Sequence, residues 1–341
     1  MNIADFDYHL PEERIAQEPA CPRGSSRLLV VHRSSGRIEP RNFRDLPDYL
    51  TPEDVVVLND TRVIRARLRG RRQPGGGKAE ALLLADQGGG VWEALVSPGR
   101  KLSPGRHIVF GEGKLRAEVL DRTPSGGRLL RFCGRADLSA ELERVGEVPL
   151  PPYIRRPLRD EADYQTMFAR TPGSSAAPTA GLHFTPELVE AIRARVAALA
   201  SVTLHIGVST FRPIHVEKLA DHKMHSESYA IPRSTARVVS DALLARRRVV
   251  AIGTSTLRAL EAAAEEDGRI RAGAGRTDLF VIPGYRFRVV GALVTNFHLP
   301  RSTLLVLVCA FAGRELVLRV YREAVAREYR FLSFGDAMLI V

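Results

Sequence analysis

The sequence predicts an α/β protein with a largely parallel sheet, interrupted by an inserted antiparallel β-barrel. Helical and strand-like segments alternate from residue 160 onward, which is typical of α/β layers. Residues 62–155 instead hold short strand-like runs between turns rich in Gly and Pro, which favours an antiparallel barrel or sandwich. Because α/β elements flank this segment on both sides, we expect a discontinuous α/β domain over residues 1–62 and 156–341 and a barrel domain over residues 63–155.

The first 61 residues supply the opening elements of the α/β domain. Hydrophobic patterning and turn signals indicate a short helix at residues 11–16, a strand at 27–32, a turn at Ser35-Gly36, a helix at 43–50 and a buried strand at 55–58.

The barrel segment is expected to hold six strands and one helix. Turn signals such as PGGG at 74–77 and GGG at 88–90 separate the strands. The expected strands cover residues 63–68, 79–84, 91–96, 107–110, 115–120 and 128–132, and the helix covers 136–145.

The remaining chain returns to the α/β pattern. The expected helices cover residues 186–200, 234–246, 254–266, 302–312 and 315–328, and the expected strands cover 201–206, 248–252, 279–282 and 292–294.

The net charge of +11 is concentrated in the middle of the chain. Residues 62–159 hold 20 Lys and Arg against 10 Asp and Glu, whereas the rest of the chain holds 30 against 29. A basic segment on a nearly neutral frame favours contact with a polyanion such as RNA or DNA. A general preference for Arg over Lys is the alternative, but it would not confine the excess to one segment.

Composition also indicates the cellular location of the protein. The three cysteines lie far apart at residues 21, 133 and 309, so they suggest neither a metal site nor a disulfide framework. The N-terminus is acidic and polar, and the longest apolar run is far too short to span a membrane. We therefore expect a cytoplasmic protein without membrane contact.

The run TPGSSAAPTAGLHFT at 171–185 is the first candidate site. Residues 171–181 carry no side chain larger than Thr or Pro, so backbone groups can come close to a ligand. His183 follows and can gain or lose a proton near neutral pH. The alternative is a flexible linker followed by a packed histidine.

Polar groups also follow two expected strands. Asn59, Asp60 and Thr61 come after the strand at 55–58, where they could bind a ligand or simply cap a turn. Residues 253–256, GTST, come after the strand at 248–252 and begin a helix, whose free N–H groups could bind a carboxylate or a phosphate. The alternative there is a helix N-cap by a hydroxyl side chain.

Histidines gather in the second half of the chain. His222, His225 and Glu227 form the densest titratable group, which could bind a metal or act as acid, base and orienting group. The nearby lysine and the lack of a clear further ligand count against zinc. Six of the nine histidines follow residue 180, which favours a site in the α/β part, and these six are His183, His205, His215, His222, His225 and His298.

Nine segments, spread from one end of the chain to the other, carry a resemblance to a known family. They are DFDYHLPEERIAQ at 5–17, VVLNDTRVIRARL at 56–68, PLPPYIRR at 149–156, AAPTAGLHFT at 176–185, TLHIGVSTFRPI at 203–214, HKMHSESY at 222–229, TDLFVIPGYRF at 277–287, TNFHLPRSTLL at 295–305 and SFGDAMLI at 333–340. Together they resemble the S-adenosylmethionine:tRNA ribosyltransferase-isomerase family of queuosine biosynthesis. The sequence departs from the family pattern at Ser174-Ser175 and Val208-Ser209, and neither departure removes a titratable group.

The resemblance implies an enzyme that transfers and isomerises the ribosyl group of S-adenosylmethionine. The acceptor would be the aminomethyl group of 7-aminomethyl-7-deazaguanine at the wobble position of tRNA, and the product would be epoxyqueuosine-tRNA with release of adenine and methionine. S-adenosylmethionine is then the co-substrate, tRNA is the partner, no metal is implied, and a monomer is expected. The family fold is an α/β domain interrupted by a β-barrel.

The resemblance also suggests roles for the candidate residues. The sulfonium acidifies the ribose C5′–H, and departing adenine needs a proton, so acid and base groups are required. The acid/base candidates are His183, His222, His225, Glu227, His298 and Asp60. The candidate contacts to S-adenosylmethionine are Pro178, Thr179, Ala180, Gly181, Gly253, Thr254, Ser255 and Thr256, the last four for the methionine carboxylate. Arg62 is expected at a phosphate or that carboxylate. Phe184 or Tyr229 could stack on the deazaguanine, but packing in the core is the favoured alternative for each.

Two other functions compete with this interpretation. One is a metal-dependent hydrolase built on His222, His225 and Glu227, which bound zinc would support. The other is a non-catalytic RNA-binding protein that uses the basic barrel, which would bind tRNA in a salt-dependent way without forming a small product.

Overall fold

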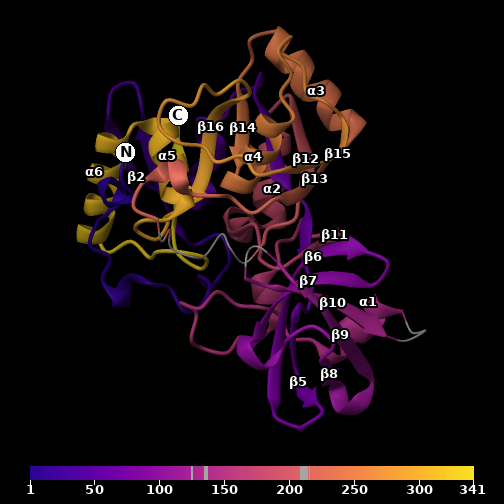
Figure 1. Ribbon diagram of the computed structural model, residues 1–341. Helices are drawn as coiled ribbons and strands as arrows, with labels where there is room; N and C mark the ends of the chain where they lie inside the picture. The colour runs from indigo at the N-terminus through magenta and orange to yellow at the C-terminus, as the bar shows by residue number, and fades with distance from the viewer. Residues whose placement is uncertain (124–125, 134–136, 208–213, 215) are drawn as a thin grey trace.

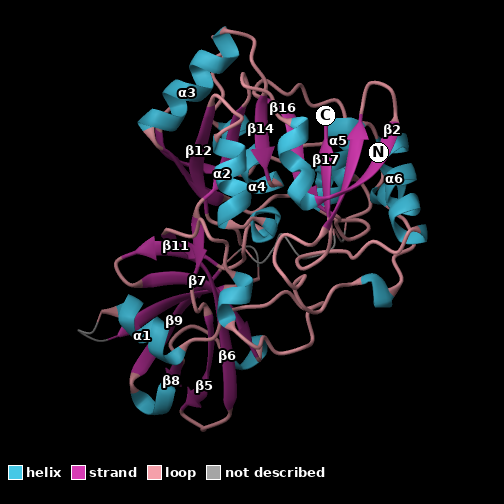
Figure 2. Cartoon of the chain, turned by 180° about the vertical axis from the view of Figure 1, so that it is seen from behind, coloured by secondary structure: helices cyan, strands magenta, loops and turns pink. Residues whose placement is uncertain are grey.

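The chain forms a nine-stranded sheet with helices on both faces and a separate closed β-barrel (Figure 1). The computed structural model describes all residues except 124–125, 134–136, 208–213 and 215. Figures 1 and 2, seen from opposite sides, both place the sheet at one end of the molecule and the barrel at the other, with β11 between them. The predicted α/β fold with an inserted antiparallel barrel is therefore confirmed.

The large sheet is parallel at its centre and antiparallel towards its edges. Its order is β15-β13-β12-β3-β14-β16-β17-β1-β2. The neighbours β12, β3, β14 and β16 pair in parallel, β17 turns antiparallel to β16, and β1 runs parallel to β17. The strands are β1 (Arg27–His32), β2 (Arg37–Asn42), β3 (Val55–Asn59), β12 (Ala198–Leu204), β13 (Glu227–Ile231), β14 (Val249–Ile252), β15 (Gly273–Thr277), β16 (Val290–Asn296) and β17 (Ala337–Ile340).

Each face of this sheet has its own hydrophobic core. In β3, Val55 and Val57 face a core shared with α3 to α6, whereas Val56 and Leu58 face a core shared with α2 and the 3₁₀ segment Phe43–Tyr49. This alternation follows from the two-residue period of a strand, and the continuous apolar run follows from burial on both faces. The helices are α2 (Pro186–Arg193), α3 (Arg233–Leu244), α4 (Thr254–Ala262), α5 (Thr303–Ala312) and α6 (Arg314–Ala326).

The barrel is one continuous insertion between two short parallel strands, β4 (Thr61–Val63) and β11 (Thr171–Ser174). Its order is β10-β7-β6-β5-β8-β9, with every neighbouring pair antiparallel. A helix, α1 (Leu138–Val145), packs Leu142 against the barrel core. The barrel strands are β5 (Arg67–Gln73), β6 (Lys78–Gly88), β7 (Val91–Ser97), β8 (His107–Phe110), β9 (Leu115–Arg122) and β10 (Arg128–Cys133).

Some expected elements differ in position. The helix expected over 186–200 ends at Arg193, because the strand β12 already begins at Ala198. The strand expected at 279–282 is absent, and the carbonyl of Leu279 accepts a hydrogen bond from the Arg258 side chain instead of a neighbouring strand. The edge strand is β15, whose sequence GAGRT has little β propensity, so only its pairing with β13 explains it. Among the described residues, no helix is long and apolar enough to cross a lipid bilayer.

Candidate active site between the sheet and the barrel

One edge of the sheet gathers most of the candidate residues. The carboxyl ends of the parallel strands β3, β14 and β16 lie at this edge, which places Asn59, Gly253 and Asn296 together. Strand β13 runs antiparallel to β12, so its first residue, Glu227, reaches the same edge. Ligands of open α/β sheets bind at this edge, outside the carboxyl ends of the parallel strands.

A cavity of about 490 Å³ lies where this edge meets the barrel. The barrel side contributes Asp86, Trp92 and Glu93, and the sheet side contributes His205 and Glu227. With Glu143 of α1, four carboxylates line the cavity, and no Lys or Arg occurs among its described lining residues. In a protein with a net charge of +11, this acidic lining favours a cationic ligand.

A second cavity of about 40 Å³ lies deeper, at the start of α4. Leu204 and Ile206 line this small cavity, whereas His205 and Gly207 line the large one, because successive residues of an extended chain face opposite sides. Glu227 lines both cavities.

The run at 171–181 extends from one cavity to the other. Gly173 borders the large cavity, and Pro178, Thr179 and Ala180 border the small one. A Cβ on Gly173 would lie 2.8 Å from a ring carbon of His205, so only glycine fits at this position. The interpretation of the run as a linker is wrong, because most of it is buried.

Two of the expected contacts to S-adenosylmethionine, Gly181 and Thr256, do not reach either cavity. Gly181 lines neither one, and a Cβ at this position would lie 2.9 Å from the Thr166 side chain. Thr256 is fully buried and donates its hydroxyl to the carbonyl of Ile252 at 2.6 Å. Both positions serve close packing rather than ligand contact.

The start of α4 is open towards the small cavity. Its N-cap is Gly253, at φ 93°, and no side chain caps the helix. The expected alternative of an N-cap by Thr254 or Ser255 is therefore wrong. Both residues line the cavity, and Ser255 Oγ instead accepts a hydrogen bond from Asn59 Nδ2 at 3.1 Å.

Glu227 forms a buried ion pair with Arg258, a residue of α4 that we did not expect at the site. Both side chains are only 5% exposed. One carboxylate oxygen of Glu227 accepts from Arg258 Nη1, and the other accepts from the backbone N–H of Gly207 at 2.9 Å. The pair holds one negative and one positive group against the same small cavity.

His205 is a further site residue that our selection from the sequence missed. Its ring lines the large cavity, and Nδ1 makes a hydrogen bond with Thr61 Oγ1 at 2.8 Å. Burial lowers its pKa from the ordinary value, and the nearby carboxylate of Asp60 opposes this shift. His205 is therefore a neutral imidazole at neutral pH, which is the form a general base requires. The signal in the sequence was the position of His205 directly after the apolar run of β12, at the end of the strand.

His183 lies behind the site rather than in it. Its Nδ1 makes a hydrogen bond with Ser26 Oγ at 2.8 Å, and Asn296 Nδ2 donates to its Nε2 at 3.2 Å. Asn296 lines the small cavity and in turn accepts from Thr179 Oγ1 at 3.1 Å, so His183 supports a cavity residue from behind. Burial, assisted by the charge of Arg330, lowers the pKa of His183 to about 4.

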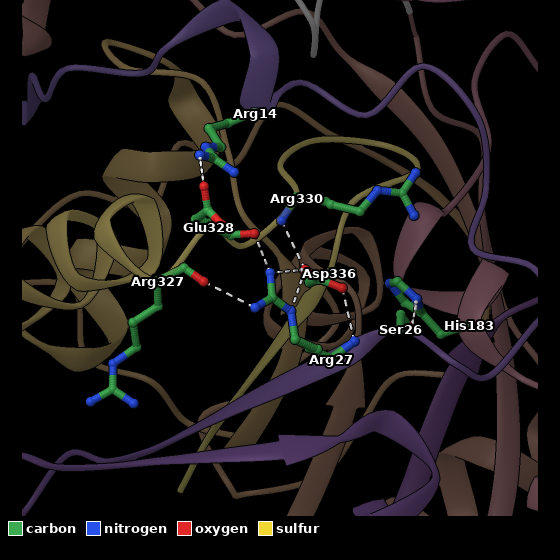
Figure 3. A network of polar contacts seen from close by, with 8 residues as sticks. All are labelled: Arg14, Ser26, Arg27, His183, Arg327, Glu328, Arg330 and Asp336. Carbon is green, nitrogen blue, oxygen red and sulfur yellow. Dashed lines mark hydrogen bonds and ion pairs between the residues drawn. The ribbon is translucent and has the colours of Figure 1, made fainter.

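Figure 3 shows what fixes His183 from behind. Ser26 precedes β1, and the adjacent Arg27 forms an ion pair with Asp336, which precedes β17. Asp336 of the segment SFGDAMLI therefore fixes the backbone at Arg27, and the adjacent Ser26 binds His183.

His298 borders the small cavity, and two hydrogen bonds fix its ring and its backbone. Its Nε2 makes a hydrogen bond with Thr295 Oγ1 at 2.8 Å, and its backbone carbonyl accepts from the Tyr8 hydroxyl. Burial lowers its pKa to about 3, so the ring stays neutral throughout the physiological range. A neutral, hydrogen-bonded ring indicates a positioning role for His298.

His222 and His225 point in different directions. His225 is exposed and lines the large cavity, whereas His222 lines neither cavity and packs its ring 5.1 Å from that of Phe280. Burial and the charge of His225 lower the pKa of His222. The described part of the chain contains no group of three His, Cys, Asp or Glu that could hold a metal ion, so the hydrolase hypothesis lacks a ligand set there.

Asp60 and Arg62, which follow β3, lie in different places. Asp60 lines neither cavity, and its carboxylate accepts hydroxyl hydrogen bonds from Thr203 at 2.6 Å and Ser201 at 3.1 Å. It therefore ties β3 to β12. Arg62 is half exposed and lies 3.9 Å from Glu143, at the rim of the large cavity.

The two expected stacking aromatics belong to the core. Phe184 is 2% exposed and packs edge-on against Phe43 and Phe168. Tyr229 is 5% exposed, and its ring packs so closely on Gly275 that a Cβ there would clash. Neither ring offers a free face to a base, and the aromatic at the large cavity is Trp92.

The departure Ser174-Ser175 does not alter the cavities. Ser174 donates to the carbonyl of Ala176, and Ser175 donates across to the carbonyl of Leu83 in the barrel, each at 2.7 Å. Val208, Ser209 and His215 lie outside the described residues.

Similarity to known proteins covers the whole chain. The sequence profile of the family described as queuosine biosynthesis protein matches residues 3–340. The chain belongs to the queuosine biosynthesis protein family. It is 54% identical to the S-adenosylmethionine:tRNA ribosyltransferase-isomerase of Symbiobacterium thermophilum and 53% identical to that of Moorella thermoacetica, and each alignment covers 100% of both proteins.

A solved structure of this family has the same overall fold. The crystal structure of S-adenosylmethionine tRNA ribosyltransferase from Thermotoga maritima is 41% identical in sequence, with a TM-score of 0.57 over 99% of this chain and 100% of that one. The predicted family is therefore confirmed, and the two cavities lie in a fold that this family shares.

Proposed function

We propose that the protein transfers and isomerises the ribosyl group of S-adenosylmethionine onto the aminomethyl group of 7-aminomethyl-7-deazaguanine in tRNA, releasing adenine and methionine. The observation that carries this proposal is full-length identity of 54% to a relative named for this activity. The large cavity agrees with it, because four carboxylates suit a sulfonium and an aminomethyl group, both of which are cationic in water.

The overall reaction determines which proton transfers the site must perform. The C5′–S and C1′–N bonds of S-adenosylmethionine break, a bond forms to the aminomethyl nitrogen, and the ribosyl group closes into an epoxycyclopentanediol. For this balance, one proton leaves C5′, one leaves the attacking neutral amine, and one reaches adenine. The charge of the sulfonium is thereby released as a single net proton, and the site must supply both a base function and an acid function.

The groups that face the large cavity can meet this need. We assign His205 as the base, because it is neutral, oriented by Thr61 and held against Gly173. His225 is the second group that can exchange protons at this cavity. Glu227 sits where both cavities meet, and its ion pair with Arg258 fixes its carboxylate there. His183 and His298 hold the site in shape and remain neutral.

The two substrates then have separate places. The carboxylate of the methionine end of S-adenosylmethionine lies in the small cavity against Pro178, Thr179, Ala180 and the start of α4. The deazaguanine enters the large cavity between the sheet and the barrel, where Trp92, only 7% exposed, forms part of the wall. The basic segment at 62–159, including Arg62 at the rim, contacts the phosphates of tRNA. The domain boundaries at residues 62/63 and 155/156, a monomeric state and a cytoplasmic location belong to the same proposal.

Release of adenine tests this function. The protein is incubated with S-adenosylmethionine and tRNA that carries 7-aminomethyl-7-deazaguanine, and free adenine is measured by chromatography. Adenine should form in proportion to modified tRNA and should not form with tRNA that carries guanine at the wobble position. If tRNA binds but no adenine appears, the protein is an RNA-binding protein and the proposal is wrong.

A further inference from the structure

Arg258 carries a buried hydrogen-bond donor without a partner. The side chain is 5% exposed, Nε donates to the carbonyl of Leu279 at 3.1 Å, and Nη1 donates to Glu227. Nη2 is fully buried and finds no acceptor among the described residues. A buried charged donor without an acceptor is strongly unfavourable, so such a group in a native fold calls for an explanation.

Arg258 lines the small cavity, next to the open start of α4. Arg258 follows Thr254 by one helical turn, and helical side chains lean towards the N-terminus, so the guanidinium returns over the first turn. The backbone N–H groups of residues 254–256 have no acceptor in the described part of the chain, and no side chain caps them. Helix amides and a guanidinium N–H therefore converge on one small space.

The ligand chemistry follows from charge and size. Free amides at a helix start and an unpaired guanidinium N–H both favour an anion. Glu227 is paired with Arg258, so its negative charge is compensated. The positive end of the α4 dipole has no such counter-charge and can attract an anion. A volume of about 40 Å³ admits a group of a few heavy atoms. A carboxylate fits this description, since its planar pair of oxygens can accept from a guanidinium and from amides at once.

We propose that Arg258 Nη2 and the first amides of α4 bind the α-carboxylate of S-adenosylmethionine, and that Arg258 selects donors that carry this carboxylate. The proposal rests on the function proposed above and adds a specificity-determining residue to it. Glu227 lies on the other side of the same guanidinium, so the pair presents opposite charges to the two ends of the amino acid.

The test compares two donors, S-adenosylmethionine and its decarboxylated form, at saturating modified tRNA. Adenine release gives kcat and KM for each donor. The wild-type protein should prefer the carboxylated donor by about 100-fold in kcat/KM, since a charge-assisted hydrogen bond is worth about 10-fold to 100-fold. Arg258→Lys keeps the charge beside Glu227 but cannot reach all three acceptors. It should lower the ratio of kcat/KM between the two donors by about 10-fold or more, mainly through the KM of S-adenosylmethionine.

The controls separate selection from folding. Arg237→Met removes an arginine that is 85% exposed on α3 and should leave the preference unchanged. If Arg258→Lys does not fold, the double variant Glu227→Gln/Arg258→Met replaces the ion pair by two neutral groups, and the ratio between the two donors is read in that protein.

The outcomes distinguish the two proposals. If the wild-type protein releases no adenine from S-adenosylmethionine, the proposed function fails. If it releases adenine but shows equal kcat/KM for both donors, or if the variants keep the wild-type preference, the role of Arg258 is wrong.

Discussion

Two arginine–carboxylate pairs at the same sheet edge use the same chemistry in opposite ways. In the pair of Arg27 and Asp336, each guanidinium nitrogen has an acceptor, namely Asp336 or the carbonyls of Arg327 and Glu328 (Figure 3). The Asp336 carboxylate also accepts the backbone N–H groups of Arg27 and Arg330, each at 2.8 Å. In the pair of Arg258 and Glu227, one nitrogen remains unpaired beside a cavity.

The difference teaches which pair maintains the fold and which one awaits a ligand. A saturated network around a buried carboxylate fixes one arrangement of the backbone and leaves no donor for another molecule. A network that lacks one acceptor is incomplete until a ligand supplies it. Substitutions in the saturated pair should therefore reduce stability, whereas substitutions at the open cavities should reduce activity.

The largest expected effect is on folding. Asp336→Ala removes the acceptor of two backbone amides and of the Arg27 guanidinium, so the free energy of unfolding should fall by about 2–4 kcal/mol, mainly through the two amides. Urea unfolding measures the change. Glu323→Ala is the matched control, because its pair with Arg327 is exposed on α6 and should contribute less than about 1 kcal/mol. A loss of less than about 1 kcal/mol for Asp336→Ala would remove the contrast between the two pairs.

The next effect is on catalysis at the large cavity. His205→Gln keeps polar bulk but removes the base, so kcat should fall by about 100-fold or more, equivalent to about 2.7 kcal/mol, with little change in unfolding. His222→Gln is the control, since that ring lines neither cavity, and it should stay within about 3-fold of wild type. Because burial lowers the pKa of His205, the acid limb of kcat/KM in the wild type should lie below the ordinary histidine pKa and should disappear in His205→Gln. Equal activity of wild type and His205→Gln would place the base elsewhere.

A smaller effect is the dependence of stability on pH that arises from His183. The pKa of His183 is about 4 in the folded protein and 6.5 in the unfolded chain, so the unfolded chain binds the extra proton first as the pH falls. The stability that this histidine contributes is complete above pH 6.5 and is lost progressively towards pH 4, by about 2 kcal/mol at pH 5. Urea unfolding at pH 7.5 and pH 5 should therefore show a shallower acid loss in His183→Gln. Parallel pH profiles would show that His183 is not held neutral.

The smallest expected effect concerns tRNA. Arg62 is half exposed at the rim, so Arg62→Ala should raise the KM for tRNA by about 3-fold to 10-fold and leave the KM for S-adenosylmethionine unchanged. The slope of log affinity against log salt should decrease by about 1 if one phosphate contact is lost. An unchanged salt slope would mean that Arg62 serves only its pair with Glu143.

The fold was largely predictable because its signals are local. Alternating apolar residues and Gly-rich turns define most strands of the barrel and of the central sheet. Strand β15 escaped because a GAGRT segment has no strand pattern of its own and depends on its partner. The helix at 186–193 was predicted too long because its apolar pattern continues into β12.

The site was predictable by segment more than by side chain. The segments 178–180 and 253–255 reach the small cavity, as their small residues suggested. His183 was misjudged because a histidine after a ligand loop looks the same whether it points forward or back, and only the contacts to Ser26 and Asn296 decide. Arg258 was missed because nothing in a helical TSTLRALEA segment distinguishes a buried arginine from an exposed one.

The parallel pairing of β4 with β11 has a topological consequence. Two parallel neighbours cannot be joined by a hairpin turn, and the chain between them must travel back along the strands, which takes a dozen residues or more. In this protein the whole barrel performs that return, from Val63 to Thr171. A shortened chain that lacks the barrel would therefore need a crossover segment in its place, because a tight turn would force the second strand to run in the opposite direction and would move Gly173 away from His205.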